Sequence, residues 1–484
     1  MKKFTFILAV FLLFACVNLY ACKGEEDANL QYEITCELSG NTLKGVEKVT
    51  YINDGDNVDK CLAFNLHANA FRKGAKYPAI SKQNEHYAFY NGESYGEIEI
   101  TKVTNEKGEN LNFNIGGVDQ NILFVNLLSE VYPNERCFVL IEYTLTLPNA
   151  IARTGINKRG INLASFYPVL CAKEKGEFYE CVYYSNGDPF YSDVADYTVT
   201  LTLDKANVVA SSGEVVSVKE KGDKKTTTYQ IKKARNFCFV ISNEYSVITD
   251  TVDGVTINYY YYNDIENKES LQVAKKALKL FNEKFCSYPY KTYSVCQTEF
   301  LEGGMEFTAL TMISDTLETD AYKEVIVHET AHQWWQTIVG NNEIEYGFLD
   351  ESLAEYSVVT FYENYAEYGY TRQGLMESAL KTYKTFCTVQ DRLFNKVDTR
   401  MIKSLKDFNS EFEYVSVAYV KGAIMHDYVR KSIGDELYFK GIKRYIEDNK
   451  FKNATPENLV GSFEKVGADT NGGFESFFNG SVIL

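Results

Sequence analysis

The chain has 484 residues, too many for one ordinary domain and enough for two or three. Its 45% hydrophobic and 24% charged residues indicate a globular protein and exclude a disordered one. With 50 basic against 66 acidic residues the formal net charge is −16, which would repel phosphate backbones, so we expect no nucleic-acid partner.

The first 22 residues have the pattern of an export signal. Lys2 and Lys3 form a basic start, an uncharged apolar run follows to Cys22, and four of the residues 23–27 are charged. Leu19-Tyr20-Ala21-Cys22 resembles a lipoprotein cleavage box, so a lipidated Cys22 that tethers the protein to a membrane, simple secretion and an uncleaved anchor all stay open. We therefore predict a signal peptide at 1–22 and an exported protein, extracellular or at the cell surface.

Nine further cysteines follow Cys22 without a C-x-x-C pair, which disfavours a zinc ribbon or a redox motif. We expect several of them to be buried and to act as small hydrophobic residues.

Residues 23–250 are predicted to form an N-terminal all-β domain. Residues 141–147 and 197–203 alternate strictly between apolar and polar side chains, as strands with one buried face do. Turn signals at 53–56 and 221–223 separate such runs, and no long helical period interrupts them. A sandwich or saddle of large sheets is the expected arrangement.

Residues 251–484 are predicted to form a second, mainly helical domain. A strand-like run at 255–262 leads into Ala274, Ala277, Leu278 and Phe281, which are spaced as the buried stripe of a helix. Residues 294–313 have strand character, and helical spacing then dominates to the end, with breaks at Gly369 and Gly434. The predicted fold class is multidomain, β followed by α+β.

The helical stretch 325–335 contains the pattern H-E-x-x-H, at His328, Glu329 and His332. Side chains four residues apart lie on one face of a helix, so the two imidazoles can aim at one point. That spacing suits two of the three protein ligands of a catalytic Zn²⁺ ion. The alternative is a buried helix with two hydrogen-bonded core histidines.

A third ligand is available beyond the second histidine, separated from it by 18 residues. Glu351 lies in a second stretch with helical spacing, and two histidines, a glutamate and a water leave the open position of a catalytic zinc. Taken alone, Glu351 is also explained as a solvated carboxylate at the start of a helix.

These motifs together resemble the M1 (gluzincin) metallopeptidases of the aminopeptidase N-like kind. Upstream, Gly303-Gly304-Met305-Glu306 is similar to the family's Gly-x-Met-Glu-Asn signature, although Phe307 replaces the final Asn. Downstream, Tyr419-Val420-Lys421-Gly422 matches its Tyr-x-Lys-Gly motif. The resemblance implies a β-sheet saddle followed by a thermolysin-like catalytic domain, in a short bacterial form that lacks the family's large C-terminal helical domain.

The resemblance also implies roles for the matching residues. One Zn²⁺ ion would be held by His328, His332 and Glu351, with Glu329 as the general base and Tyr419 as hydrogen-bond donor to the transition-state oxyanion. Substrate binding would fall to Gly303, Gly304, Met305 and Glu306, with Glu306 pairing with the α-ammonium group of a peptide that has a free N-terminus.

Three points stay open in the sequence. Phe307 could alter the first side-chain pocket or loosen the strand that binds the substrate. Glu355 is either a partner that orients His328 or a surface carboxylate. The N-terminal domain should add one polar residue near the substrate amine, which we expect between Phe166 and Gly187.

The function predicted from these residues is that of a zinc aminopeptidase, which removes N-terminal residues by attack of a metal-activated water. Two alternatives remain: a zinc endopeptidase or other zinc hydrolase, and a surface lipoprotein that binds peptides with little turnover.

Overall fold

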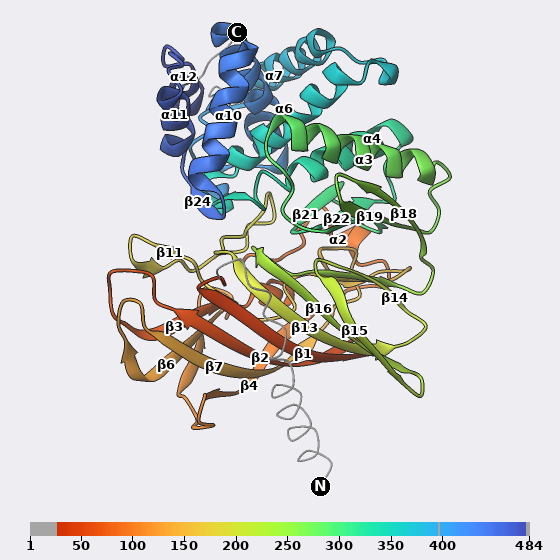
Figure 1. The fold of residues 1–484 in the computed structure, drawn as a ribbon, viewed down its shortest axis with the longest axis vertical. Coiled ribbons are helices and arrows are strands. Elements are labelled where there is room, and N and C mark those ends of the chain that lie inside the picture. The colour runs from red at the N-terminus through yellow and green to blue at the C-terminus, as the bar shows by residue number, and fades with distance from the viewer. Residues whose placement is uncertain (1–26, 395–396, 481–484) are drawn as a thin grey trace.

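The computed structural model describes residues 27–394 and 397–480. The predicted export signal at 1–22, with Cys22, lies outside these residues. Figure 1 shows that strands dominate the amino-terminal half and that the helices of the carboxyl-terminal half gather on one side of this β layer. Within the described ranges, no helix combines the length and apolar character needed to cross a membrane.

A seven-stranded sheet is the largest element of the amino-terminal half, in the order β15-β16-β13-β1-β2-β7-β4. Its strands are β1 (Leu30–Ser39), β2 (Thr42–Ile52), β4 (Glu97–Asn105), β7 (Arg136–Thr146), β13 (Ala195–Asp204), β15 (Glu214–Lys221) and β16 (Lys224–Ala234). Neighbours are antiparallel except β1 and β13, which run parallel. The alternating runs predicted as strands fall in β7 and β13, where mostly every second residue is buried.

Smaller sheets complete this half. One has the order β10-β3-β6-β5, another β14-β17-β9-β8, and β11 pairs with β12. Their strands are β3 (Asp59–Asn65), β5 (Phe113–Gly116), β6 (Ile122–Val131), β8 (Thr154–Ile156), β9 (Ile161–Leu163), β10 (Val169–Leu170), β11 (Lys173–Glu174), β12 (Glu177–Phe178), β14 (Val208–Ser211) and β17 (Phe239–Ser242). Two short helical turns, η1 (His67–Phe71) and α2 (Glu85–Ala88), lie between strands. The predicted all-β character of this half is confirmed.

The carboxyl-terminal half begins with a five-stranded sheet in the order β18-β19-β20-β22-β21. Its strands are β18 (Ser246–Val252), β19 (Val255–Tyr261), β20 (Thr292–Thr298), β21 (Gly304–Phe307) and β22 (Leu310–Ser314). Strands β19, β20 and β22 are parallel, and the two edge strands are antiparallel to them. The domain boundary expected at 250/251 stays a prediction, and β18, which pairs with β19, runs across it.

Helices make up most of the remaining chain. They are α3 (Asn267–Lys284), α4 (Thr319–Ala331), α5 (Glu343–Tyr346), α6 (Phe348–Asn364), η2 (Ala366–Tyr368), α7 (Arg372–Phe394), η3 (Leu405–Asp407), α8 (Glu411–Tyr414), a π-helical turn η4 (Val415–Val420), α9 (Lys421–Ile433), α10 (Asp435–Asn449), α11 (Pro456–Lys465) and α12 (Gly473–Asn479). The short strands β23 (Val339–Asn341) and β24 (Lys452–Ala454) pair in parallel. Gly369 and Gly434, both with positive φ, end helical segments as predicted.

The helix predicted over 325–335 ends earlier than expected, because α4 stops at Ala331. His332 keeps right-handed helical backbone angles, so its imidazole still lies on the same face as that of His328. Beyond it, Trp334 and Trp335 are buried and the chain turns at Gln336, which has a positive φ. Burial of the two indoles overrides the local helical preference.

The nine cysteines from Cys36 to Cys387 are all free thiols, and six of them are buried. Their expected use as small buried hydrophobic residues is confirmed.

One charged residue lies inside the β layer without a partner. Glu47, on the buried face of β2, has no solvent exposure, and neither of its carboxylate oxygens has a hydrogen-bond partner among the described residues. Burial raises the pKa of Glu47 well above its ordinary value of 4.5. Above about pH 4.5 the unfolded chain therefore loses this proton while the folded chain keeps it, so the stability contributed by Glu47 falls as the pH rises.

We expect Glu47→Leu to raise the free energy of unfolding at pH 8 by about 1–3 kcal/mol, because it removes an unpaired buried polar group. The gain should be smaller at pH 5. Glu47→Gln is the matched control, because it keeps the polar atoms and removes the ionisation. It should make the free energy of unfolding less dependent on pH and should raise it by less than Glu47→Leu does. Thermal unfolding at the two pH values measures both effects, and a Glu47→Leu protein that is less stable at pH 8 would contradict them.

Candidate metal centre and its pocket

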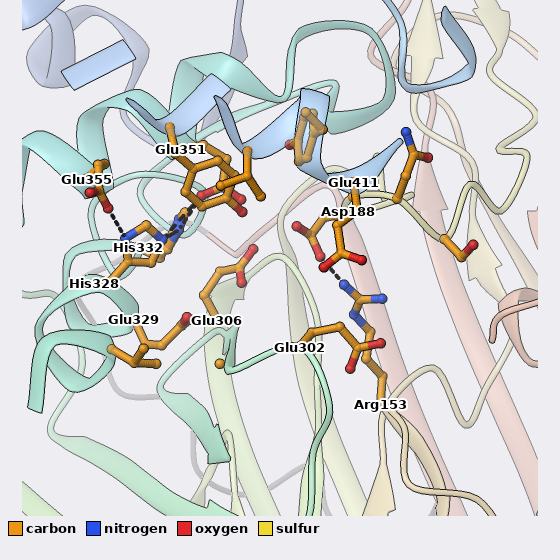
Figure 2. Close-up of a pocket in the computed structure, with 18 of the residues that line it drawn as sticks. Arg153, Asp188, Glu302, Glu306, His328, Glu329, His332, Glu351, Glu355 and Glu411 are labelled. Carbon is orange, nitrogen blue, oxygen red and sulfur yellow. Dashed lines mark hydrogen bonds and ion pairs between the residues drawn. The ribbon is translucent and has the colours of Figure 1, made fainter. Parts of the chain in front are cut away.

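Most residues predicted for the site come from separate elements that meet at one cavity of about 230 Å³. Helix α4 supplies His328 and Glu329, and His332 directly follows its last residue. Glu351 lies in the first turn of α6, and Glu306 lies on β21. Figure 2 shows these side chains pointing towards one another from the different elements.

Three donor atoms converge at the centre of this site. His328 Nε2 lies 3.1 Å from His332 Nε2, and Glu351 Oε2 lies 3.2 Å from the first nitrogen and 3.3 Å from the second. Ligands about 2.0–2.1 Å from a tetrahedral zinc ion are about 3.3 Å from one another. The three atoms therefore form one face of a tetrahedron of the size that zinc requires.

In each imidazole the hydrogen bond made by Nδ1 determines that the lone pair lies on Nε2. His332 Nδ1 lies 3.0 Å from the carbonyl oxygen of Trp335, which can only accept, so Nδ1 is the donor. His328 Nδ1 lies 3.3 Å from Glu355 Oε2. Both Nε2 atoms then face each other with lone pairs, an arrangement that calls for a cation between them. The residues present fit a zinc ion, and Glu355 takes the orienting position rather than that of a surface carboxylate.

The electric field at the site also favours positive charge. Burial lowers the pKa of His332, but the carboxylates of Glu306 and Glu351 outweigh it and raise that pKa to about 10. Burial raises the pKa of Glu351, yet the two imidazoles bring it below its ordinary value. The surrounding carboxylates therefore favour a positive charge at this point, as a bound metal ion would supply.

Glu329 is positioned by close packing against the neighbouring strand. It is buried, and its Oε2 atom has no hydrogen-bond partner among the described residues. A Cβ atom at Gly304 would lie 2.2 Å from Glu329 Oε1, so only glycine leaves room for this carboxylate. Burial raises the pKa of Glu329 to about 7, against the opposing effect of the two imidazoles. The carboxyl group can therefore accept and release a proton near neutral pH.

Tyr419 reaches the site from a π-helical turn. Its ring stacks on that of His328, with centroids 5.6 Å apart and 9° between the planes. Because a π-helical turn is wider than an α-helical one, Tyr414 and Tyr419, which are five residues apart, lie on the same side of it. Their ring centroids are 5.8 Å apart, and both residues line the cavity. Burial and the carboxylate of Glu351 raise the pKa of Tyr419 well above its ordinary value, so its hydroxyl is a hydrogen-bond donor at neutral pH.

The strand β21 presents alternate residues to the cavity. Gly304 and Glu306 line it, and Glu306 Oε1 is buried without a partner. Met305 points to the other face of the strand, as the two-residue period requires, and its sulfur lies 3.0 Å from Arg153 Nε. Gly303 and Met305, predicted to bind substrate, are therefore not part of the cavity wall. Gly303 adopts φ +89°, which turns the chain into the strand.

Phe307 also faces away from the catalytic cavity. Its side chain is buried in a cluster with Phe300 and Met312, and its carbonyl oxygen accepts a hydrogen bond from Gln333 Nε2 at 3.1 Å. This bond ties the end of β21 to the segment that carries His332. The side chain of Phe307 therefore packs behind the strand and does not line the cavity.

The far side of the cavity contains residues that sequence reasoning missed. Arg153, just before β8, and Asp188 form a buried ion pair of 2.6 Å, and Glu302 and Glu411 lie at the rim beside them. Asp188 follows directly after the interval in which a polar residue was expected from the N-terminal half. Arg153 carried no local signal, because its partner lies 35 residues away in the chain.

Comparisons with known proteins agree with this geometry. Residues 269–479 match the family profile described as "Peptidase family M1 domain". Aminopeptidase N of Lactobacillus delbrueckii subsp. lactis is 30% identical over 241 residues, which are 46% of this chain and 28% of that protein. Probable aminopeptidase 1 of Saccharolobus solfataricus is 22% identical over 465 residues, which are 91% of this chain and 52% of that protein. The chain spans about a third of the length of the first curated relatives it matches.

Solved structures share the fold along almost the whole chain. An M1 zinc metallopeptidase from Deinococcus radiodurans aligns with a TM-score of 0.67 and 16% identity, over 95% of this chain and 96% of that one. A two-domain M1 zinc metallopeptidase mutant bound to L-arginine aligns with a TM-score of 0.66 and 14% identity, over 95% and 96% of the two chains. At these identities the likeness shows a common architecture, with β sheets first and a mainly helical region after them.

We expect Glu355→Gln to weaken zinc binding by about 10–100-fold, because the amide orients the His328 imidazole less firmly and lowers its basicity. Glu324→Gln is the matched control, since Glu324 lines the same cavity and makes no hydrogen bond to an imidazole. Competition with a chromogenic chelator measures the affinity of each purified variant. Equal affinities for the two variants would contradict the orienting role of Glu355.

Proposed function

We propose that this chain, whose residues 269–479 match the profile of the peptidase family M1 domain, is a zinc-dependent aminopeptidase that hydrolyses N-terminal residues from peptides. A zinc site alone would suit many hydrolases. The observation that carries the proposal is Glu306, a buried carboxylate with an unpartnered oxygen in the same cavity as the three zinc donors. Such a group offers a charge-assisted hydrogen bond to the α-ammonium group of a peptide.

The residues of the site support a division of labour in the hydrolysis. A zinc ion bound by His328, His332 and Glu351 supplies Lewis-acid chemistry, which polarises the scissile carbonyl and makes the attacking water more acidic. Glu329, whose carboxylate lies in the same cavity as the three donors, takes the proton of that water and passes it to the leaving amine.

Tyr419 and Glu306 act on the substrate rather than on the water. The Tyr419 hydroxyl donates a hydrogen bond to the substrate oxygen as negative charge develops on it, a contact that strengthens towards the transition state. Glu306 pairs with the free amino group and so sets which peptide bond reaches Glu329. A peptide with a blocked amino terminus would leave the Glu306 carboxylate buried and unpaired, which disfavours binding.

We also propose that the protein is exported, to the cell surface or the surrounding medium. The support is the basic start and apolar run of residues 1–22, with Cys22 as the candidate site of a lipid tether. Mass spectrometry of the mature amino terminus distinguishes a lipidated Cys22 from simple cleavage, and an unprocessed Met1 in a soluble cell fraction would refute export.

The proposed activity is tested with aminoacyl p-nitroanilides that are either unblocked or N-acetylated. Zinc-loaded protein should cleave the unblocked substrates, lose this activity with a zinc chelator, and regain it when zinc is added back. Cleavage of the acetylated substrates at a similar rate would indicate an endopeptidase instead. An absence of chelator-sensitive cleavage would indicate a peptide-binding protein with little turnover.

We expect Glu306→Gln to lower kcat/KM for unblocked substrates by about 10–100-fold, because the charged partner of the α-ammonium group is lost. The zinc content should not change, since Glu306 is not one of the three converging donors. Metal analysis of the same preparation provides the control. A variant that keeps its full preference for unblocked over acetylated substrates would exclude this role for Glu306.

A further inference from the structure

The cavity does not end at Glu306. In Figure 2 it continues beyond this residue, on the side away from the two histidines, to Arg153 and Asp188. Glu302 and Glu411 lie there as well, and both are exposed at the rim. The electrostatic neighbours of Glu302 are Arg153, Glu411 and Asp188, which places these four side chains in one region. We refer to this region as the far subsite.

The far subsite carries an excess of negative charge. Arg153 and Asp188 neutralise each other in their buried ion pair, and Arg153 Nε is directed at the sulfur of Met305. Glu302 and Glu411 form no ion pair with any cation among residues 27–394 and 397–480. Three carboxylates therefore face one guanidinium, and two negative charges remain without a partner.

The proposed function decides what can occupy this space. In the proposed function the α-ammonium group of a peptide meets Glu306 and its first carbonyl lies at the zinc site. Because the zinc donors and the far subsite lie on opposite sides of Glu306, we place the rest of the peptide away from the far subsite. Nothing precedes the first residue of an aminopeptidase substrate. The only part of the peptide that can enter the far subsite is then the side chain of that first residue.

We infer that the enzyme prefers peptides whose first residue carries a long cationic side chain, arginine or lysine, which the carboxylates of Glu302 and Glu411 would receive. The inference rests on the proposed function and specifies its substrate class. A guanidinium or ammonium group at the end of three or four methylene groups can span from the backbone to a rim carboxylate, while its stem lies along the cavity wall. An acidic first side chain would meet like charge and is disfavoured.

The test compares substrates that differ in charge and little in shape. L-Arginine p-nitroanilide and L-citrulline p-nitroanilide have side chains of equal length, and only the first is charged. Zinc-loaded protein should cleave the arginine substrate with a kcat/KM about tenfold higher, the effect of one charge-assisted contact at a half-exposed site. Added salt should reduce the ratio, because rim charges are screened. Equal values for the two substrates, or a preference for a glutamyl substrate, would overturn the inference.

Variants locate the source of the preference. In Glu302→Gln/Glu411→Gln the ratio of arginine to citrulline cleavage should fall to about one. Glu324→Gln is the matched control, because Glu324 contributes the same charge to the cavity from the opposite side, near His328. That control should keep the wild-type ratio. A ratio that falls equally in both proteins would assign the preference to overall charge and overturn the role of the far subsite.

A binding measurement separates failure of this inference from failure of the proposed function. Calorimetry with L-arginine and L-citrulline on zinc-loaded protein reports the far subsite without turnover. If no unblocked substrate is cleaved, the proposed function fails, and tighter binding of arginine would still support the acidic subsite. If leucine p-nitroanilide is cleaved while arginine and citrulline behave alike in both assays, the function stands and the inference fails alone.

Discussion

Three electron-pair donors held about 3.2 Å apart in a buried pocket are the constraint on which the rest of this structure depends. Lone pairs of two imidazoles and a carboxylate repel one another at that distance unless a cation lies between them. The protein keeps them together with contacts from outside, the carbonyl of Trp335 behind His332 and the carboxylate of Glu355 behind His328. A cation bound by these three donors would therefore stabilise the folded arrangement of the two helices.

Repulsion between buried groups also affects the carboxylates around the donors. Six of them are buried at or near the cavity: Asp188, Glu306, Glu329, Glu343, Asp350 and Glu351. Burial and their mutual repulsion raise the pKa of most of these groups, which is a cost to folding that the surrounding core must outweigh. Such a concentration of unfavourable charge suits a pocket that receives cations: a metal ion, a peptide ammonium group and, in our inference, a basic side chain.

The β layer contributes side chains to the wall of the cavity. Arg153 and Asp188, both from the amino-terminal half, close the side of the pocket that faces away from the zinc donors. Arg153 also contacts the sulfur of Met305, so the wall and the strand that carries Glu306 are joined. A peptide bound in the cavity would therefore touch both halves of the chain. If the proposed function holds, side chains of the amino-terminal half would help to select the first residue of the peptide.

The sequence by itself determined the features that depend on short spacing, because local geometry repeats along the chain. These features are the alternating strands, the breaks at Gly369 and Gly434, and the i, i+4 pair of His328 and His332. Glu351 could be offered as a third ligand from the chemistry of a catalytic zinc site, with a solvated carboxylate as the alternative, whereas Tyr419 could be proposed only through a family resemblance. Tertiary structure alone decided that α4 stops at Ala331, that a π-helical turn aims Tyr419 at His328, that Met305 faces away from the cavity, and that Arg153 meets Asp188. These features come from packing between segments distant in the chain, which no local period encodes.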